Sequence, residues 1–228
     1  MKELNQLQES ELGHPETKTR ISQYELAFRM QLSASEVMDL TKEPQKVLDA
    51  YGAKPGAGSF ANNCLLARRL VEQGVRYVQL FDWGWDFHGT NPKEDIRDGL
   101  TQKGTATAQS VAALINDLKD RGLLEATTIV WAGEFGRTPK INQGKGRDHF
   151  PNAWSTVIAG GGVKGGVASG KTSKDGTTVE ERVTPAVDFL ATVCSALGVD
   201  FEKQNMSNVG PPIRIVEKGA KPVAEVLA

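Results

Sequence analysis

The stretch that decides the fold runs from Thr127 to Pro151 and reads TTIVWAGEFGRTPKINQGKGRDHFP. Its first six residues combine β-branched and aromatic side chains, a composition typical of a buried strand. The Gly-rich loop that follows carries two carboxylates, two arginines and a histidine. Glu134 is therefore expected at the carboxyl end of a strand. In open α/β sheets this edge binds ligands, because the loops there form a crevice into which helix N-termini direct partial positive charge.

A second polar segment is expected at the same kind of position. Val75–Phe81, VRYVQLF, has the composition of another strand and leads directly into Asp82–Asn91, DWGWDFHGTN. His88 and His149, two of the three histidines in the chain, lie in the two polar segments, and each has an aspartate one or two residues away. The two segments meet in space if their strands are neighbours in the sheet.

The order of these elements predicts an α/β fold. A strand over 75–81, a helix over about 97–121 and a strand over 127–132 follow one another, and a further strand is expected over 154–159. Alternation of strand, helix and strand implies a parallel sheet with right-handed crossovers. The other predicted elements are an amphipathic helix over 20–32 with Ile21, Tyr24, Phe28 and Leu32 on one face, a short helix over 35–40, a helix over 60–73, a helix from a Thr184 cap to Leu197, and an edge strand over 213–216.

The size and charge of the chain limit the number of domains and the kinds of partner that we expect. With 228 residues and 39% hydrophobic content, it is expected to form one α/β domain over 1–228, and two domains are the weaker alternative. Within it we expect a helical lead segment over 1–58, a sheet core with the site loops over 59–200 and a tail over 201–228. Twenty-seven basic side chains against 28 acidic ones provide no general attraction for nucleic acid or an anionic membrane.

Neither a membrane span nor a signal peptide is expected. No apolar run approaches the roughly 20 residues of a membrane helix. The chain's start, MKELNQLQESELGHPETKTR, is too polar for an export signal. Cys64 and Cys194 lie far apart in helix-like apolar contexts, where free thiols are commoner than a disulfide. Neither has the spacing of a thiolate zinc site.

The polar segments have the residue types of a divalent metal site. Zinc and manganese accept mixed carboxylate and imidazole ligands, and a hydrolytic site leaves one position open for water or a substrate oxygen. The candidate ligands are Asp82, Asp86, His88, Glu134, Asp148 and His149. Arg137 and Arg147 are candidate clamps for phosphate or sulfate, because a guanidinium offers two parallel donors.

Each of these residues has a structural alternative. The aspartate and histidine of either segment could cap a turn and hydrogen-bond to the backbone. Glu134 could form an ion pair with Arg137 that braces the sheet edge, and a lone arginine is commonly a surface residue. Four tryptophans could stack on a sugar ring, although such residues beside strand ends are more often packing residues: Trp83, Trp85, Trp131 and Trp154.

Several long segments carry a resemblance to a known family. They read ISQYELAFRMQLSASEVMDLTKEP, NNCLLARRLVEQGVRYVQL, WDFHGTNP, VWAGEFGRTPKIN, GRDHFPNAWSTVIAGGGVKGG and VTPAVDFLATVCSALGVD. In this order they resemble the bacterial family known as domain of unknown function 1501, and together they span nearly the whole chain. The family is grouped with sulfatases and alkaline phosphatases. The resemblance therefore implies a three-layer α/β/α fold with a mostly parallel, alkaline-phosphatase-like sheet and a metal-centred site for phosphate or sulfate esters.

The resemblance also implies roles for individual residues. One metal of the wider superfamily would be held by Asp82 or Asp86 together with His88 and His149. A second metal relies on an Asp-His pair after the next strand, where this chain has Glu134 followed by phenylalanine, so a second ion is not expected.

Family members resemble this chain only in their second half. They carry upstream an export signal, the first strands and the superfamily's nucleophile. The chain is therefore expected to lack the N-terminal part of that fold, as a truncated reading frame, a processed fragment or a split gene. The resemblance also suggests a periplasmic or secreted protein.

Two functions from different classes follow. The first is a metal-dependent hydrolase of phosphate or sulfate esters, or its C-terminal half, with zinc, manganese or calcium as cofactor. Arg137 and Arg147 would bind a small anionic ester or a sulfated or phosphorylated carbohydrate, and Glu134 or His149 would assist proton transfer. The second is a non-catalytic exported binding or structural module. In both cases an exposed apolar sheet edge predicts a homo-oligomer or pairing with a missing N-terminal half.

Overall fold

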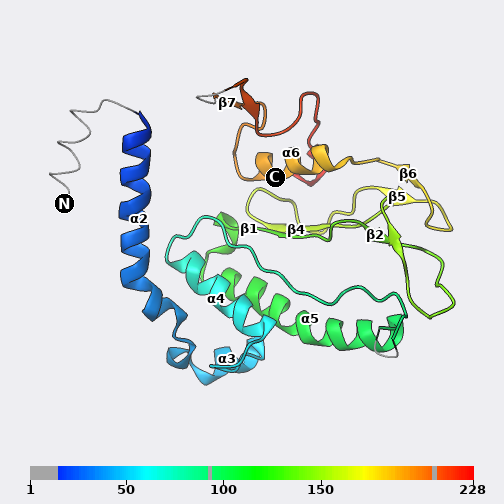
Figure 1. The fold of residues 1–228 in the computed structure, drawn as a ribbon, viewed down its shortest axis with the longest axis horizontal. Helices are drawn as coiled ribbons and strands as arrows, with labels where there is room; N and C mark the ends of the chain where they lie inside the picture. The colour runs from blue at the N-terminus through cyan, green and yellow to red at the C-terminus, as the bar shows by residue number, and fades with distance from the viewer. Residues whose placement is uncertain (1–14, 92–93, 207–209) are drawn as a thin grey trace. The chain divides into compact units, whose positions relative to one another are not determined.

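The structure is a computed structural model that describes residues 15–91, 94–206 and 210–228 (Figure 1). The chain forms two compact units, Met1–Leu80 and Phe81–Ala228, which we call unit 1 and unit 2. No helix among the described residues is both long enough and apolar enough to span a membrane. Cys64 and Cys194 are not joined by a disulfide.

Unit 1 is helical. Its elements are α2 (Pro15–Met38), the 3₁₀ helix η1 (Leu40–Lys42), α3 (Gln45–Tyr51) and α4 (Phe60–Glu72). The helix predicted over 60–73 is confirmed as α4, which Ser59 caps by accepting a hydrogen bond from the Asn62 N–H. The helices predicted over 20–32 and 35–40 are one continuous helix, α2. Tyr24 and Phe28 on its apolar stripe are exposed.

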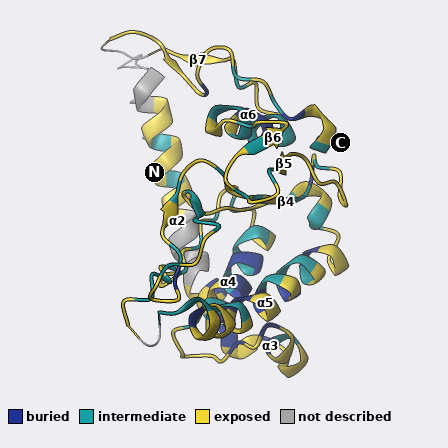
Figure 2. Cartoon of the chain, turned by 90° about the vertical axis from the view of Figure 1, so that its right-hand side faces the viewer, coloured by how far each residue is buried: buried dark blue, intermediate teal, exposed yellow. Residues whose placement is uncertain are grey.

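The core of unit 1 forms between α3 and α4. Cys64 and Leu65 of α4 are fully buried, and Leu48 and Tyr51 of α3 are buried as well. Figure 2 shows buried residues along α4. Asn62 holds the loop between the two helices, because its side chain accepts from the Lys54 N–H and donates to the carbonyls of Lys54 and Ala57.

A buried ionic cluster joins the elements of unit 1. The Glu43 carboxylate accepts hydrogen bonds from Arg68, at 2.7 Å, and from Arg69. Arg69 also donates to the carbonyls of Glu36 and Val37 in the last turn of α2. One arginine thus satisfies carbonyl groups that have no partner inside the helix.

Unit 2 contains two longer helices and several short strands. Its helices are α5 (Ile96–Asp120), η2 (Leu124–Ala126), α6 (Ala186–Ala196) and η3 (Ala224–Val226). Its strands are β1 (Thr128–Trp131), β2 (Gly136–Arg137), β3 (His149–Phe150), β4 (Val157–Gly160), β5 (Lys171–Thr172), β6 (Val179–Glu181), β7 (Gln204–Asn205) and β8 (Ile213–Arg214). Figures 1 and 2 show α5 on one side of β1 and β4 and α6 on the other.

Most elements of unit 2 lie where the sequence predicts them. α5, β1, β4, α6 and β8 match the helix over 97–121, the strands over 127–132 and 154–159, the helix to Leu197 and the edge strand over 213–216 within a few residues. The Thr184 cap is wrong, because the Thr184 hydroxyl donates to the Arg182 carbonyl and α6 begins after Pro185 without a side-chain cap.

The predicted three-layer α/β/α fold with a mostly parallel, alkaline-phosphatase-like sheet is wrong. The described strands form four separate two-stranded pairs, β1–β4, β2–β3, β5–β6 and β7–β8, and all are antiparallel. The physical reason lies in the connection from β1 to β4. A parallel pair needs a crossover, usually a helix. Residues 132–156 contain no helix, so the chain returns beside β1 in the opposite direction, with Trp131 opposite Val157.

The strand predicted over 75–81 is also wrong. This segment has the composition of a strand, but it has no neighbouring strand within the described residues. A strand requires a partner for its backbone groups, and composition alone does not supply one. The division of 1–228 into a single domain with lead segment, core and tail remains a prediction.

Candidate metal centre

Two segments of unit 2 supply the polar residues that the sequence predicts for a site. Asp86 and His88 lie on the irregular segment before α5, whereas Arg137 and His149 lie on β2 and β3. In the β2–β3 pair Arg137 is directly opposite His149. Residues opposite each other in an antiparallel pair have neighbouring side chains. The short pair therefore brings a guanidinium beside an imidazole from the two ends of a long loop.

The loop between β2 and β3 is held by its own hydrogen bonds. The Thr138 N–H donates to the Asp148 carbonyl at 2.9 Å, and the Asn142 N–H donates to the Gly146 carbonyl at 2.9 Å. Arg147 crosses the loop and donates through Nη1 to the carbonyls of Thr138 and Pro139. Its guanidinium braces the loop from inside.

Close backbone contact attaches this loop to the segment that carries His88. A Cβ atom on Gly146 would lie 2.1 Å from the His88 carbonyl carbon, and one on Gly89, whose φ is +76°, would lie 2.0 Å from the Gly144 oxygen. Only glycine permits this approach. The Arg147 N–H donates to the Phe87 carbonyl at 2.8 Å, and Asn142 Nδ2 donates to the His88 carbonyl at 3.0 Å. The glycines that mark the loop in the sequence thus fix the position of His88.

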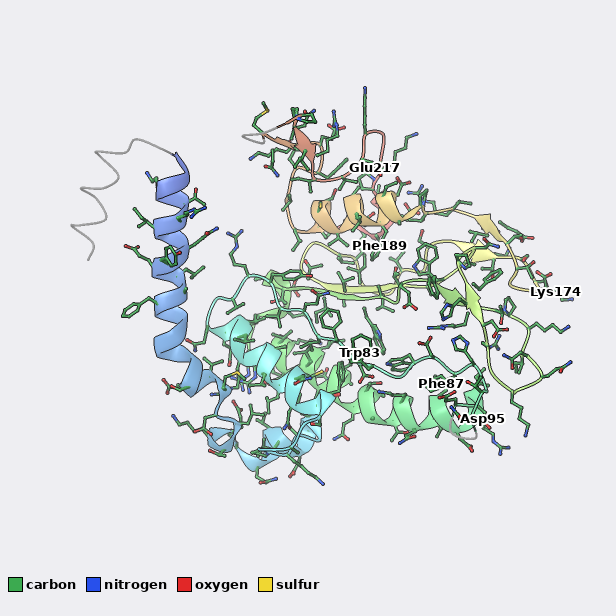
Figure 3. All side chains as sticks on the ribbon, viewed as in Figure 1. Trp83, Phe87, Asp95, Lys174, Phe189 and Glu217 are labelled. Atoms are coloured by element: carbon green, nitrogen blue, oxygen red, sulfur yellow. The ribbon has the colours of Figure 1, made fainter. Side chains whose placement is uncertain are left out.

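The start of α5 holds both segments of the site in place. Asp95 caps this helix by accepting from the Asp98 N–H, and the Gly89 N–H donates to the Glu94 carbonyl at 2.9 Å. The Ile96 N–H donates to the Lys145 carbonyl at 3.0 Å, so both segments of the site are attached to the same end of α5. Figure 3 shows Phe87, next to His88 in the sequence, at this end of the helix together with Asp95.

Asp86, His88 and His149 form the centre of the site. One potential ligand atom from each lies within 4.8 Å of the others. Asp86 Oδ1 is 3.2 Å from His149 Nε2 and 3.5 Å from His88 Nε2, and the two imidazole rings are 4.8 Å apart between centroids. The two separations from Asp86 Oδ1 bracket the roughly 3.3 Å between neighbouring ligand atoms of a tetrahedral zinc ion whose bonds are about 2.0–2.1 Å long.

The hydrogen bond of His88 defines its tautomer. His88 Nδ1 is 2.9 Å from the Arg147 carbonyl oxygen, which only accepts hydrogen bonds, so Nδ1 carries the proton. The neutral ring then has its lone pair on Nε2, the nitrogen that faces Asp86. Histidines that bind metals typically donate their other N–H to a carbonyl or carboxylate in this way.

Arg137 lies at the edge of this centre. Its Nη1 donates to Asp86 Oδ1 at 2.8 Å and its Nη2 donates to Glu134 Oε1 at 3.3 Å. The hydrogen bond from Arg137, followed by that from His149, holds the pKa of the Asp86 carboxyl below its usual value. Asp86 is therefore ionised at neutral pH. It and His149 are exposed and His88 is half-buried, so the centre is open to solvent.

Other predicted site residues lie outside the central three. Asp82 accepts from Lys103 at 3.1 Å and from Trp85 Nε1 at 2.7 Å, which attaches its segment to α5. Asp148 accepts from Asn142 Nδ2 and lies 3.7 Å from His88 Nδ1, on the side of the ring away from Asp86. Arg147 directs its guanidinium into the loop. The assignments of Asp82, Asp148 and Arg147 as ligands or anion clamp remain predictions.

Two residues that the sequence did not single out organise the site. Asn142 contacts His88, Gly146 and Asp148 through its side chain. The Phe135 ring lies 4.5 Å from the His149 ring between centroids, and the Arg137 guanidinium lies 5.6 Å from the Phe135 centroid. An asparagine between glycines in a loop is the kind of signal that could have drawn attention to the first.

The chain belongs to the family described as protein of unknown function (DUF1501), whose model matches residues 1–227. This confirms the family that the sequence resembles. No curated protein and no solved structure matches the chain.

Proposed function

We propose that the chain is a metal-dependent hydrolase of phosphate or sulfate esters, in which Asp86, His88 and His149 hold a divalent cation and Arg137 binds the anion. The observation that carries the proposal is the convergence of one carboxylate and two imidazoles, with the His88 lone pair directed at Asp86. The proposal rests on this geometry and not on an alkaline-phosphatase-like sheet.

The local charge favours a cation. Asp86 and Asp148 lie within 4 Å of a His88 nitrogen, and Glu94 interacts electrostatically with His88. A fourth carboxylate, Glu134, is paired with Arg137, and two guanidinium groups, those of Arg137 and Arg147, oppose the four carboxylates. One of these arginines is held by loop carbonyls. A divalent ion would offset the excess of negative charge at the open centre. Mixed nitrogen and oxygen ligands suit zinc or manganese better than calcium, which takes oxygen ligands.

Three protein ligands leave room for a substrate. Catalytic zinc sites use three side chains and keep one position open. Bound there, a divalent cation would polarise an ester oxygen and lower the pKa of water. The exposure of Asp86 and His149 gives an ester access without a lid.

Arg137 and Glu134 have separate roles in this proposal. The Arg137 fork would turn from Asp86 to the tetrahedral anion, since it offers two parallel donors and already lies beside the centre. Glu134 is exposed and within hydrogen-bond distance of Arg137. Because both imidazoles are ligands, Glu134 is the group left to accept a proton from water.

A phosphatase and sulfatase assay tests the proposal. We expect purified chain with added zinc or manganese to hydrolyse p-nitrophenyl phosphate or sulfate, and we expect His88→Ala to abolish this activity. Arg137→Ala should raise KM more than it lowers kcat. Asp175→Asn is the matched control, because Asp175 is an exposed carboxylate whose partners are Ser173 and Thr177 in the turn between β5 and β6.

A non-catalytic binding module is the second candidate. It is favoured by one observation, which is that Asp86 Oδ1 is already a hydrogen-bond partner of both Arg137 and His149. Metal binding without turnover of either ester would support this candidate. Turnover that survives in His88→Ala would contradict both.

A further inference from the structure

The segment Val75–Trp83 between α4 and Asp86 has the properties of a strand that has no partner. Its sequence, VRYVQLFDW, contains no proline, glycine or lysine. Within the described part of the chain, none of the N–H or C=O groups of residues 76–83 makes a main-chain hydrogen bond. Such a row of open backbone groups is a template for pairing with another strand.

Exposure along the segment alternates as in a strand with one open face. Tyr77 is 77% exposed, Phe81 64% and Trp83 85%. Gln79 lies between them and is also exposed, whereas Val78, Leu80 and Asp82 are half-buried. Side chains two residues apart lie on one face of a strand. Three large aromatic side chains are therefore presented on the same face of one extended segment.

The sequence of the segment is complementary to itself in the antiparallel direction. Around Gln79, positions at equal distances on either side are Val78 and Leu80, Tyr77 and Phe81, then Arg76 and Asp82. Two copies paired antiparallel about Gln79 would place aliphatic beside aliphatic, aromatic beside aromatic, and a cation beside an anion. Arg76 is exposed and has no ion-pair partner among the described residues.

We propose that two copies of this chain associate through Val75–Trp83, which pair as antiparallel strands across a twofold axis at Gln79. Such an interface is isologous, so every contact occurs twice. On the order of eight to ten main-chain hydrogen bonds would form across it. The Asp82 carboxylate can accept from Arg76 of the second copy while it keeps Lys103 and Trp85, because a carboxylate has about four acceptor sites.

The self-complementarity favours a second copy over an unrelated strand. An unrelated strand with apolar side chains at alternate positions could match the apolar side chains of this segment, but its sequence need not match the charges at the two ends. A second copy that runs antiparallel matches the opposite charges at the two ends, because its Asp82 then lies beside Arg76 and its Arg76 beside Asp82. Association does not depend on the proposed hydrolase activity.

Cysteine cross-linking tests the register. In a Cys194→Ser background, Gln79→Cys places two thiols opposite each other on the axis, within the Cα separation that a disulfide spans. Mild oxidation is expected to give a covalent dimer of Gln79→Cys at low micromolar concentration. Gln73→Cys, at the end of α4, is the matched control and should remain monomeric. Dimers from both variants, or from neither, would overturn the proposal.

Light scattering and sedimentation across a concentration series provide the second test. We expect a reversible monomer–dimer equilibrium, weakened about tenfold by Arg76→Glu because two cross-strand ion pairs become repulsive. Arg97→Glu is the control, since Arg97 is highly exposed on α5. The double substitution Val78→Pro and Gln79→Pro removes an N–H from each edge of the strand and should abolish dimers. A strict monomer at all concentrations, or a dimer that survives this double substitution, would overturn the proposal.

Discussion

Removal of the Glu43 carboxylate is expected to destabilise unit 1 strongly. The Glu43 side chain is 5% exposed and that of Arg68 is 2% exposed, so their ion pair is out of contact with water. Truncating one partner of a buried pair leaves an uncompensated charge, which costs about 3–5 kcal/mol. Arg68 keeps Glu72 as a partner, at 2.5 Å and partly exposed. We therefore expect Glu43→Ala to cost about 3 kcal/mol, the lower end of that range.

Urea unfolding followed by circular dichroism measures this cost. The control is Glu36→Ala, because the Glu36 side chain is 75% exposed and lies 3.7 Å from Lys42. Exposed pairs of this kind contribute at most about 1 kcal/mol. Equal midpoints for the two variants would refute the argument from burial.

The pH dependence of stability provides a second readout of the same cluster. Burial raises the pKa of Glu43, but hydrogen bonds from Arg68 and Arg69 outweigh this effect, so the folded pKa lies below the ordinary value of 4.5. A depressed pKa means that the stabilisation is fully present above about pH 4.5 and is lost as the pH falls through the folded pKa. Glu43→Gln should reduce the fall in the free energy of unfolding below about pH 4.5. An unchanged fall in this variant would show that Glu43 does not titrate as argued.

Two further predictions concern unit 2. Gly146→Ala should displace the loop from His88 and lower both stability and metal affinity, because the added Cβ would overlap the His88 backbone. Gly165→Ala should change neither, because its Cβ would meet nothing within 4 Å. Thermal unfolding and metal titration compare the two variants. The hydrogen bonds from Arg182, then from its own backbone and Ser169, lower the pKa of Glu225 to about 2. Arg182→Ala should return this pKa toward 4.5 in a carboxyl NMR titration, and an unmoved pKa would count against the pairing.

Local features of the fold were predictable from the sequence. The period of apolar residues predicts α4, α5 and α6, and β-branched composition predicts β1, since each depends on residues that are close in the chain. The direction of pairing is not local. It depends on which strands become neighbours, and the prediction of a parallel sheet assumed that Val75–Phe81 would pair with β1.

The candidate site was predictable in part for a related reason. The sequence draws attention to Asp86, His88 and His149, because carboxylate and imidazole groups are the ligand types that divalent metals such as zinc and manganese accept. It could not separate Asp86 from Asp82, four residues earlier. That distinction depends on Lys103 of α5, which forms an ion pair with the Asp82 carboxylate. The loop glycines allow the loop backbone to approach the backbone of the His88 segment closely, and this role can be recognised only in the structure.

Metal content after dialysis tests the central claim most directly. Elemental mass spectrometry of chain loaded with zinc or manganese is predicted to give one ion per chain. Asp86→Asn, His88→Ala and His149→Ala should each lose it, with affinity reduced by more than the roughly 10- to 100-fold that loss of a ligand's hydrogen-bond partner costs. Asp175→Asn, which changes an exposed carboxylate in the turn between β5 and β6, should retain the ion. A chain that binds no ion, or one that all three variants retain, would contradict the account.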